Sequence, residues 1–189
     1  MNHFDLPSPL DKIFADTDDL PIFFDRLMLA LVELLACDRC YLYLRDPQHC
    51  IGQILHCYSI HPELPNLIEA EKRTEDFYIS KANPLFAAAI NCEATIFIED
   101  IDNVSPIDQD QDFWQQNYCN HKSLIQAHLC LNQELWGILQ ISNFNRPRPW
   151  TKFDRSLVSQ IVNRITPLAS IYAQKKLGKT VQQYHDGKC

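Results

Sequence analysis

Residues 114–123, WQQNYCNHKS, place four side chains that can do chemistry within one short segment. The thiol of Cys119 lies two positions before the imidazole of His121, and the aromatic rings of Trp114 and Tyr118 lie just upstream. A thiol, an imidazole and two aromatic rings in ten residues make this segment the first candidate for a ligand site. The alternative is that both rings belong to the hydrophobic core and that Cys119 is an incidental thiol.

A second candidate is the pair Cys37 and Cys40, a CxxC in a chain of eight cysteines. Such a pair can hold an iron–sulfur cluster or act as a redox couple, but no second CxxC completes a zinc site. The irregular spacing of the cysteines argues against a disulfide framework. We expect most of them to pack as small hydrophobic residues. Strand alternation also puts Cys40 and Cys57 on an apolar face, where a cluster lacks room.

Composition and missing motifs exclude several function classes. The chain has 24 acidic and 17 basic residues and a net charge of -7, which disfavours nucleic-acid binding. The most apolar window, residues 27–36, is too short to span a bilayer and contains Glu33. With no signal peptide at the start, we expect a cytoplasmic protein without a membrane segment. No GxSxG, P-loop, HExxH or Ser-His-Asp order occurs, so we expect no enzyme and no catalytic residues.

The elements that must position these residues follow from periodicity and capping. Asp19 is a candidate N-cap, with Pro21 in the first turn, for a helix that is apolar on more than one side. Strands that cluster without regular βαβ alternation indicate an α+β fold with a central antiparallel sheet. Helices are predicted at residues 20–36, 83–91, 109–120 and 152–177, strands at 40–45, 53–60, 94–101, 123–131 and 134–144, and a loop with a short helix at 61–76.

These elements divide the chain into an acidic lead-in at residues 1–19, a domain at 20–177 and a tail at 178–189. Taking every second strand residue gives the predicted sheet two unlike faces. One face is apolar and suits the two terminal helices, which we expect to pack there. It collects Leu42, Leu44, Leu55, Cys57, Ile125, Ala127 and Leu129. The other face is aromatic and polar, is expected to lie under the short middle helices, and collects Tyr41, Tyr43, His56, Tyr58, Gln126 and His128.

The arrangement from about Leu20 to Ala173, roughly 150 residues, resembles a known family, and three segments carry the resemblance. SLIQAHLCLNQELWGILQISN is similar to the paired strands of GAF domains, the small-molecule sensing modules of bacterial signalling proteins, and TIFIEDIDN is similar to the segment before them. FNRPRPWTKFDRSLV resembles the junction that enters the last GAF helix, supplied here by Asn145, Arg146, Trp150 and Asp154. The resemblance implies that Arg146 pairs with Asp154 while Trp150 packs beneath.

The resemblance also suggests ligands. Bilin-binding GAF domains attach a tetrapyrrole through a cysteine commonly followed at once by histidine, whereas Cys119 is followed by an asparagine and then His121. Asp100 would then hydrogen-bond pyrrole nitrogens or a purine edge. Redox-sensing members of the family permit a cluster or redox role for Cys37 and Cys40. His128 replaces a usual proline, and Arg155 replaces a usual glutamate, which weakens a cyclic-nucleotide interpretation. The cysteine-bearing, glycine-rich segment of the GAF-fold methionine sulfoxide reductase is absent.

GAF domains typically dimerise through their terminal helices, so the resemblance implies a homodimer. The residues assigned to its interface are Phe23, Leu27, Leu31, Leu157, Ile161, Ile165 and Leu168. Our interpretation is therefore a non-catalytic sensory domain that responds to a small molecule or to redox state, and that passes its signal through a helical dimer to a downstream protein. The alternative is an unliganded GAF-fold scaffold that binds a protein partner. Bilin attachment at Cys119 and an iron–sulfur site are further alternatives.

Overall fold

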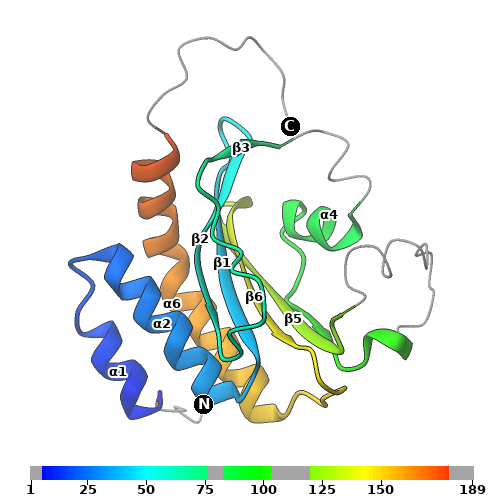
Figure 1. Cartoon of the computed structure of the whole chain (residues 1–189). Helices are drawn as coiled ribbons and strands as arrows, with labels where there is room; N and C mark the ends of the chain where they lie inside the picture. Colours follow the sequence, from blue (N-terminus) through cyan, green and yellow to red (C-terminus); the bar gives the residue numbers. More distant parts are fainter. Residues whose placement is uncertain (1–5, 76–82, 104–119, 179–189) are drawn as a thin grey trace.

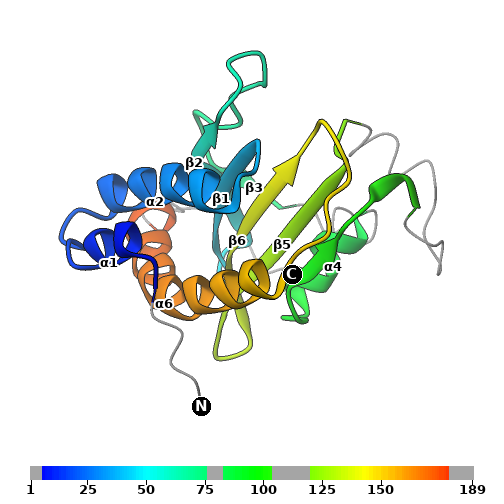
Figure 2. The ribbon, with the colours of Figure 1, turned by 90° about the horizontal axis from the view of Figure 1, so that it is seen from below.

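The computed structural model describes residues 6–75, 83–103 and 120–178 as a layered α+β domain (Figure 1). Two helices cover one face of the sheet, α2 (Leu20–Leu35) and α6 (Lys152–Leu177), and the short helix α1 (Ser8–Phe14) packs against α2 on the same side (Figure 2). The short helix α4 (Pro84–Ile90) lies on the other face, as the view from below also shows (Figure 2). This confirms the predicted fold class and its two layers of helices. Within the described residues, no helix is both long and apolar enough to cross a membrane.

The sheet is antiparallel throughout its described strands. The strands are β1 (Arg39–Asp46), β2 (Ile51–Ser59), β3 (Arg73–Thr74), β4 (Ile96–Ile98), β5 (Ser123–Leu131) and β6 (Glu134–Asn143), arranged in the order β3-β2-β1-β6-β5-β4. A short 3-10 helix, η1 (Ile101–Asn103), follows β4. Asn132 and Gln133 join β5 to β6 with φ angles of 54° and 64°. Positive φ at both central residues is what a two-residue hairpin turn of the favoured twist requires.

Local signals set the ends of the helices. The Asp19 side chain accepts a hydrogen bond from the backbone N–H of Ile22 at 3.1 Å, as the predicted N-cap should. The Thr151 hydroxyl and the Asp154 carboxylate form a reciprocal capping box at the start of α6. Helix α6 continues through Pro167. The helix predicted at residues 109–120 falls largely outside the described residues, and residues 61–75 contain the short strand β3 and no helix.

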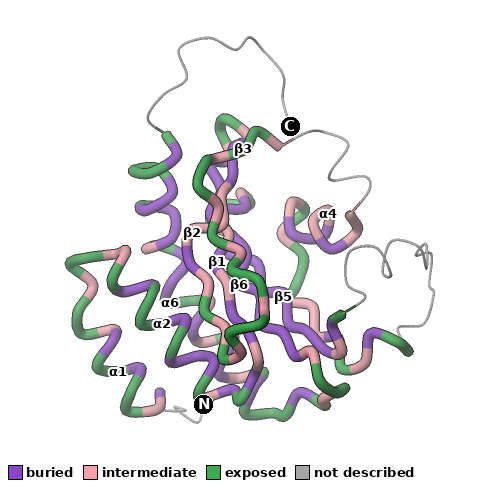
Figure 3. The backbone as a smooth tube through the Cα atoms, viewed as in Figure 1, coloured by how far each residue is buried: buried purple, intermediate pink, exposed green. Residues whose placement is uncertain are grey.

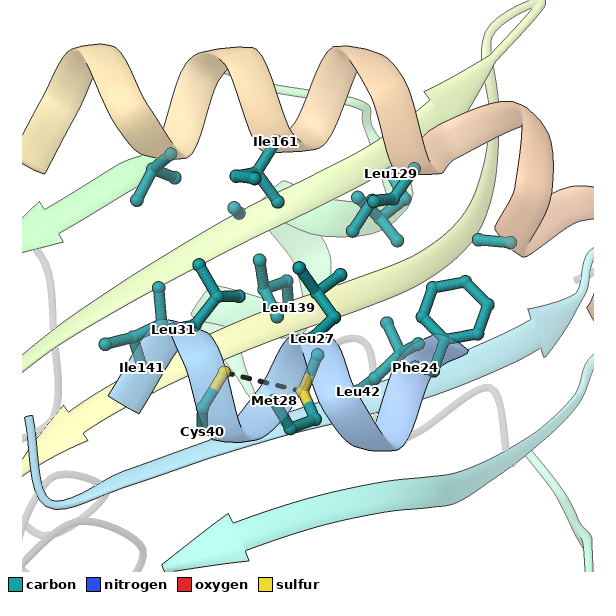
Figure 4. Packing of buried hydrophobic residues seen from close by; sticks show 14 of the residues in the cluster. Phe24, Leu27, Met28, Leu31, Cys40, Leu42, Leu129, Leu139, Ile141 and Ile161 are labelled. Atoms are coloured by element: carbon teal, nitrogen blue, oxygen red, sulfur yellow. Dashed lines mark hydrogen bonds between the residues drawn. The ribbon is translucent and has the colours of Figure 1, made fainter. Parts of the chain in front are cut away.

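The main core lies between the helices α2 and α6 and the apolar face of the sheet. Figure 3 shows the buried side of both helices turned toward the strands, and Figure 4 shows Leu27, Leu31 and Ile161 reaching into this layer. Of the seven residues assigned to a dimer interface, all but Leu168 are buried in this single-chain core, and Leu168 is half-buried against it. The assignment is therefore corrected. The apolar stripes pack against the sheet and are not available to a second copy.

One strand presents its faces differently from the prediction. The register between β1 and β2 shifts between Leu42 and Tyr43, so that Leu42 pairs with His56 while Tyr43 pairs with Ile54. The skipped residue is Leu55, which makes this a β-bulge. As a result His56 lies on the helix side, where its ring contacts Phe24 and Tyr172. Tyr58 pairs with Cys40 on the same side, and Cys57 pairs with Tyr41 on the opposite side.

A candidate ligand-binding face of the sheet

The sheet face opposite the terminal helices carries a row of polar side chains, which we call the polar strip. Register places Tyr41, Gln140 and Gln126 side by side across β1, β6 and β5, and it places Arg39 beside Ser142. Most of the row is buried although it lies outside the main core. The strip consists of Arg39, Tyr41, Gln126, His128, Gln140 and Ser142.

The centre of the polar strip is ordered by side-chain hydrogen bonds. The Tyr41 hydroxyl donates to Gln140 Oε1 at 2.8 Å, and Gln140 Nε2 donates to the Ser142 hydroxyl at 3.3 Å. Gln140 is buried, so both ends of its amide need partners inside the protein. This chain of bonds holds polar groups in fixed orientations. A sheet face that only packed against other elements would carry aliphatic side chains at these positions.

Helix α4 is attached to the strip by a second chain of bonds. Gln126 Nε2 donates to the carbonyl of Leu85 at 2.7 Å and lies 3.2 Å from His128 Nε2. Since an amide nitrogen only donates, His128 Nε2 is the acceptor, and Nδ1 carries the hydrogen that is donated to the carbonyl of Glu93 at 2.8 Å. Burial lowers the pKa of His128 and keeps the ring neutral. Because both ring nitrogens are occupied, the structure gives His128 the role of holding α4 in place of the predicted ligand contact.

A disulfide between Cys92 and Cys130 reinforces this attachment. It joins the residue after the C-cap of α4 to β5, across a sequence separation of 38 residues. The expectation that most cysteines pack as small hydrophobic residues is therefore wrong for this pair. The fold brings the end of α4 next to β5, and the spacing of the two cysteines in the sequence does not reveal this.

One end of the polar strip contains a buried arginine. Arg39 is 5% exposed, its guanidinium lies over the ring of Phe144 at 4.7 Å, and its terminal nitrogen is 3.5 Å from His121 Nε2. His121 and Phe144 also contact each other, with ring centroids 4.6 Å apart. Burial lowers the pKa of Arg39 because the charged form is desolvated. The structure thus brings the predicted site residue His121 to the strip, beside an arginine that sequence reasoning missed.

The other end is closed by a paired network. The Tyr43 hydroxyl donates to the Glu75 carboxylate, and Arg45 Nε donates to the same group at 2.8 Å. Burial raises the pKa of the Tyr43 hydroxyl, with the Glu75 charge as the second cause. Tyr43 also packs edge-on against Phe86 of α4 at 6.2 Å. Arg45 and Glu75, whose side chains are both largely buried, therefore compensate each other's charge at this end.

The remaining predicted ligand residues fall into two groups. Asp100 accepts hydrogen bonds from the backbone of Asp102 and the amide of Asn103, so its carboxylate shapes the turn into η1. Trp114, Tyr118 and Cys119 lie outside the described residues. The prediction of a ligand at Cys119 therefore stays a prediction.

Cys37 and Cys40 are buried free thiols in the main core. The Cys40 thiol contacts the sulfur of Met28 at 3.5 Å, as Figure 4 shows. Burial raises the pKa of Cys37 to about 12 and also raises that of Cys40. No group of three metal-ligating side chains occurs among residues 6–75, 83–103 and 120–178. Thiols held protonated in an apolar layer are unsuited to the predicted cluster or redox role.

The junction before α6 is an ion-paired corner, but with a different arginine from the one predicted. Arg148, and not Arg146, pairs with Asp154, at 3.1 and 3.2 Å to its two oxygens. Asn145 and Arg146 are exposed. Trp150 is buried as expected, donates its indole N–H to the carbonyl of Ile98 at 2.9 Å, and lies under the Arg148 guanidinium. Arg148 also donates to the carbonyls of Leu35 and Ala36, so one side chain joins the end of α2 to the start of α6.

Strand alternation in the sequence indicated most residues of the polar strip. Tyr41 and Gln126 fall on the predicted polar face, and Gln140 and Ser142 alternate with apolar residues in β6. Arg39 had no such signal, because a basic residue at the start of a strand is ordinarily exposed. Ser59, which faces Arg39 from β2, became recognisable only through the strand register.

Comparisons with known proteins agree with this architecture. A sequence model of the GAF domain matches residues 19–166. Comparison with curated protein sequences gave no match. Similar solved structures include the phycocyanobilin-bound GAF domain of a cyanobacterial phytochrome, with 21% identity, a TM-score of 0.66, and coverage of 92% of this chain and 97% of that one.

Two further structures show the same fold at lower identity. The cyanobacteriochrome TePixJ GAF domain has 16% identity and a TM-score of 0.61, with 86% of this chain and 95% of that one covered. The GAF domain of an Acinetobacter phosphoenolpyruvate-protein phosphotransferase has 12% identity and a TM-score of 0.63, with 93% and 100% covered. GAF domains are in general sensory and regulatory modules. With the family match spanning most of its length and its layers arranged as in these structures, this chain belongs to the GAF domain family.

Proposed function

We propose that this chain is a non-catalytic sensory domain that binds a small organic molecule on the polar strip. The observation that carries the proposal is the hydrogen-bonded row of half-buried Tyr41 and buried Gln140 and Ser142 on the sheet. Small-molecule sites combine an apolar lining with a few fixed polar groups that orient the ligand. A GAF domain with a similar fold is described as bound to phycocyanobilin, which supports an organic ligand on this fold.

The output of this sensor is proposed to pass through the terminal helices, in a homodimer that acts on a downstream signalling protein. The predicted interface residues are core residues, so any contact between copies must use other side chains. Three exposed apolar residues on α2 and α6 are suitable: Ile22 is 54% exposed, Leu29 37% and Ile171 56%. We place the protein in the cytoplasm, as its composition predicts.

Binding is tested by native mass spectrometry of protein purified from the organism that encodes it. The wild type is expected to carry a small molecule that Gln140→Ala loses, because that variant removes both bonds in the centre of the strip. Ser170→Ala is the matched control, since it removes a buried hydroxyl bonded to the Pro167 carbonyl at 2.8 Å within α6. A ligand that is retained by Gln140→Ala would contradict the proposed site. A wild type that carries nothing would favour the unliganded scaffold.

An absorption spectrum of the same sample from 300 to 750 nm tests the chromophore alternative. A visible band that survives denaturation and disappears in Cys119→Ala would establish covalent tetrapyrrole attachment at that residue. A band that is lost on denaturation would indicate a noncovalent pigment on the strip. A colourless sample excludes both pigments and leaves a colourless ligand.

The dimer is tested by sedimentation velocity. Ile171→Glu and Ile22→Glu place a charge on the helix layer and are expected to shift a dimeric protein to monomer. Leu131→Glu, on a residue of similar type that is 36% exposed at the far turn of the hairpin, should leave the dimer unchanged. A wild type that sediments as a monomer at micromolar concentration would remove the dimeric output.

A further inference from the structure

Arg39 is a buried cation that has no anion beside it. Among the described residues no carboxylate lies within 4.0 Å of its guanidinium, although six other lysine or arginine side chains there pair with a carboxylate. The groups that act on its charge through space are Cys57 and Tyr41. Arginine does not lose its proton in proteins, so the charge is present and desolvated. A buried unpaired charge is strongly unfavourable unless something compensates it.

The contacts that Arg39 makes leave its donor capacity partly unused. The Phe144 ring supplies a cation–π contact to the flat face of the guanidinium. His121 Nε2 can only accept from it, because arginine has no acceptor, so this nitrogen is unprotonated. Arg39 Nε is buried and has no hydrogen-bond partner among the described residues. The flat face and one terminal nitrogen of the guanidinium therefore have contacts, while its Nε lacks an acceptor in the described part of the chain.

Two serine hydroxyls stand on either side of this arginine. Arg39 pairs in register with Ser59 of β2 and with Ser142 of β6. The Ser59 hydroxyl oxygen is likewise buried and has no hydrogen-bond partner in the described part of the chain. Ser142 belongs to the hydrogen-bonded centre of the polar strip through Gln140. A guanidinium with hydroxyl donors next to it is a ligand set that matches the oxygens of a carboxylate or a phosphate.

We propose that Arg39, with Ser59 and Ser142, is an anion-binding subsite at one end of the polar strip, and that it receives a carboxylate or phosphate group of the ligand. This inference rests on the proposed function, because it names the chemical class of the molecule that the strip binds: an organic anion. The anion supplies the missing countercharge. The polar centre at Tyr41 and Gln140 then contacts the remainder of the molecule.

The subsite is tested with simple anions and matched arginine variants. The melting temperature is measured in sodium phosphate and in sodium acetate, from 0 to 100 mM, with ionic strength held constant by sodium chloride. A ligand that binds only the folded state raises the melting temperature progressively with its concentration. Arg39→Met removes the charge and keeps an unbranched apolar stem, Arg39→Lys keeps the charge, and Arg146→Met changes an exposed arginine as the control.

The wild type and Arg146→Met are expected to melt at higher temperature as one of the two anions is added, and Arg39→Met is expected not to respond. The anion that acts distinguishes a carboxylate from a phosphate. Without anion, Arg39→Met should melt no lower than the wild type, because it removes a desolvated charge. A wild type that does not respond to either anion, or an Arg39→Met variant that responds as the wild type does, would overturn the subsite.

The same variants separate this inference from the proposed function. A small molecule that copurifies with the wild type, is lost in Gln140→Ala and is retained undiminished by Arg39→Met would keep the polar-strip site and refute the anion subsite. If no molecule copurifies and an anion still stabilises the wild type through Arg39, the subsite stands and the proposed organic ligand fails. A ligand lost in both variants supports both statements.

Discussion

Arg148 and Arg39 are two arginines that lie next to an aromatic ring and differ in everything else around the guanidinium. Arg148 stacks on Trp150, pairs with both oxygens of Asp154 and donates to two backbone carbonyls. Arg39 stacks on Phe144, but among the residues that the structure describes it has no carboxylate near it and keeps a buried donor without an acceptor. The first arginine is satisfied by the fold, whereas the second is the one to which we assign an anionic group of the ligand. Stability and binding are thus assigned to two different arginines, although both lie near the end of the sheet where β1 begins.

Replacement of each arginine by methionine is expected to give the largest difference in unfolding free energy. Arg148→Met leaves Asp154, which is 2% exposed, without its partner, and it removes the link to α2. Breaking a buried ion pair from one side costs about 3–5 kcal/mol of unfolding free energy. Arg39→Met should cost nothing. Urea denaturation of both variants and of Arg146→Met measures this, and equal losses at positions 148 and 39 would remove the distinction between the two regions.

Removal of the disulfide tests whether the sheet face that carries the polar strip unfolds separately from the junction before α6. Cys92→Ser with Cys130→Ser opens a loop of 38 residues, which is expected to lower stability by about 2–4 kcal/mol. Hydrogen exchange should rise around α4 and β5, with the start of α6 unchanged. Cys57→Ser, at a half-buried free thiol, is the control. Faster exchange across the whole domain would mean that the two regions unfold as one.

A smaller effect is expected inside the strip. Tyr41→Phe removes one hydrogen bond to Gln140, and the net contribution of such a bond is about 1 kcal/mol. The loss should be smaller for the ligand-bound protein if the ligand supplies Gln140 with another donor. Thermal denaturation of the variant with and without the copurified molecule measures both values. A loss as large as that at Arg148 would show that the strip is a structural network.

The smallest effect is a pH dependence from His128. Burial lowers its pKa below the ordinary histidine value of 6.5, so the unfolded chain binds more protons than the folded chain as pH falls from 6.5 toward the pKa of the folded state. The stabilising contribution is therefore complete above pH 6.5 and decreases as the pH is lowered through this interval. His128→Gln should reduce the slope of unfolding free energy between pH 7.5 and 5.5, while His61→Gln, at an exposed ring, serves as control. An unchanged slope in His128→Gln would contradict a neutral ring.

Features that depend on neighbouring residues were predictable from the sequence. Asp19 and Pro21 mark the start of α2, and the alternation in β5 and β6 identifies a hairpin whose turn is Asn132 and Gln133. The match to the family junction found the buried Trp150 and Asp154. These signals act over a few residues, so reading the chain locally was enough to obtain the fold class.

Features that depend on register were not predictable. The bulge at Leu55 reverses the faces of β2 and moves His56 to the helices, although alternation alone assigns it to the polar face. Arg146 and Arg148 lie two residues apart among prolines, and only the course of the loop decides which reaches Asp154. The stripe of Leu27, Leu31 and Ile161 suits a core and a dimer interface equally well, and in the structure it forms the core.

The bonds of Arg148 also fix the start of α6 to the end of α2. Helices α2 and α6 run antiparallel, since the end of α2 meets the start of α6 at Arg148 while Phe24 stacks on Tyr172 farther along. A helix of 26 residues is about 39 Å long, so turning α6 by about 5° at this corner displaces its other end by about 3 Å. Leu177 at that end is 1% exposed and its carbonyl accepts a hydrogen bond from Lys72 Nζ at 3.0 Å, so a movement of this size would have to break contacts at the far end of the helix.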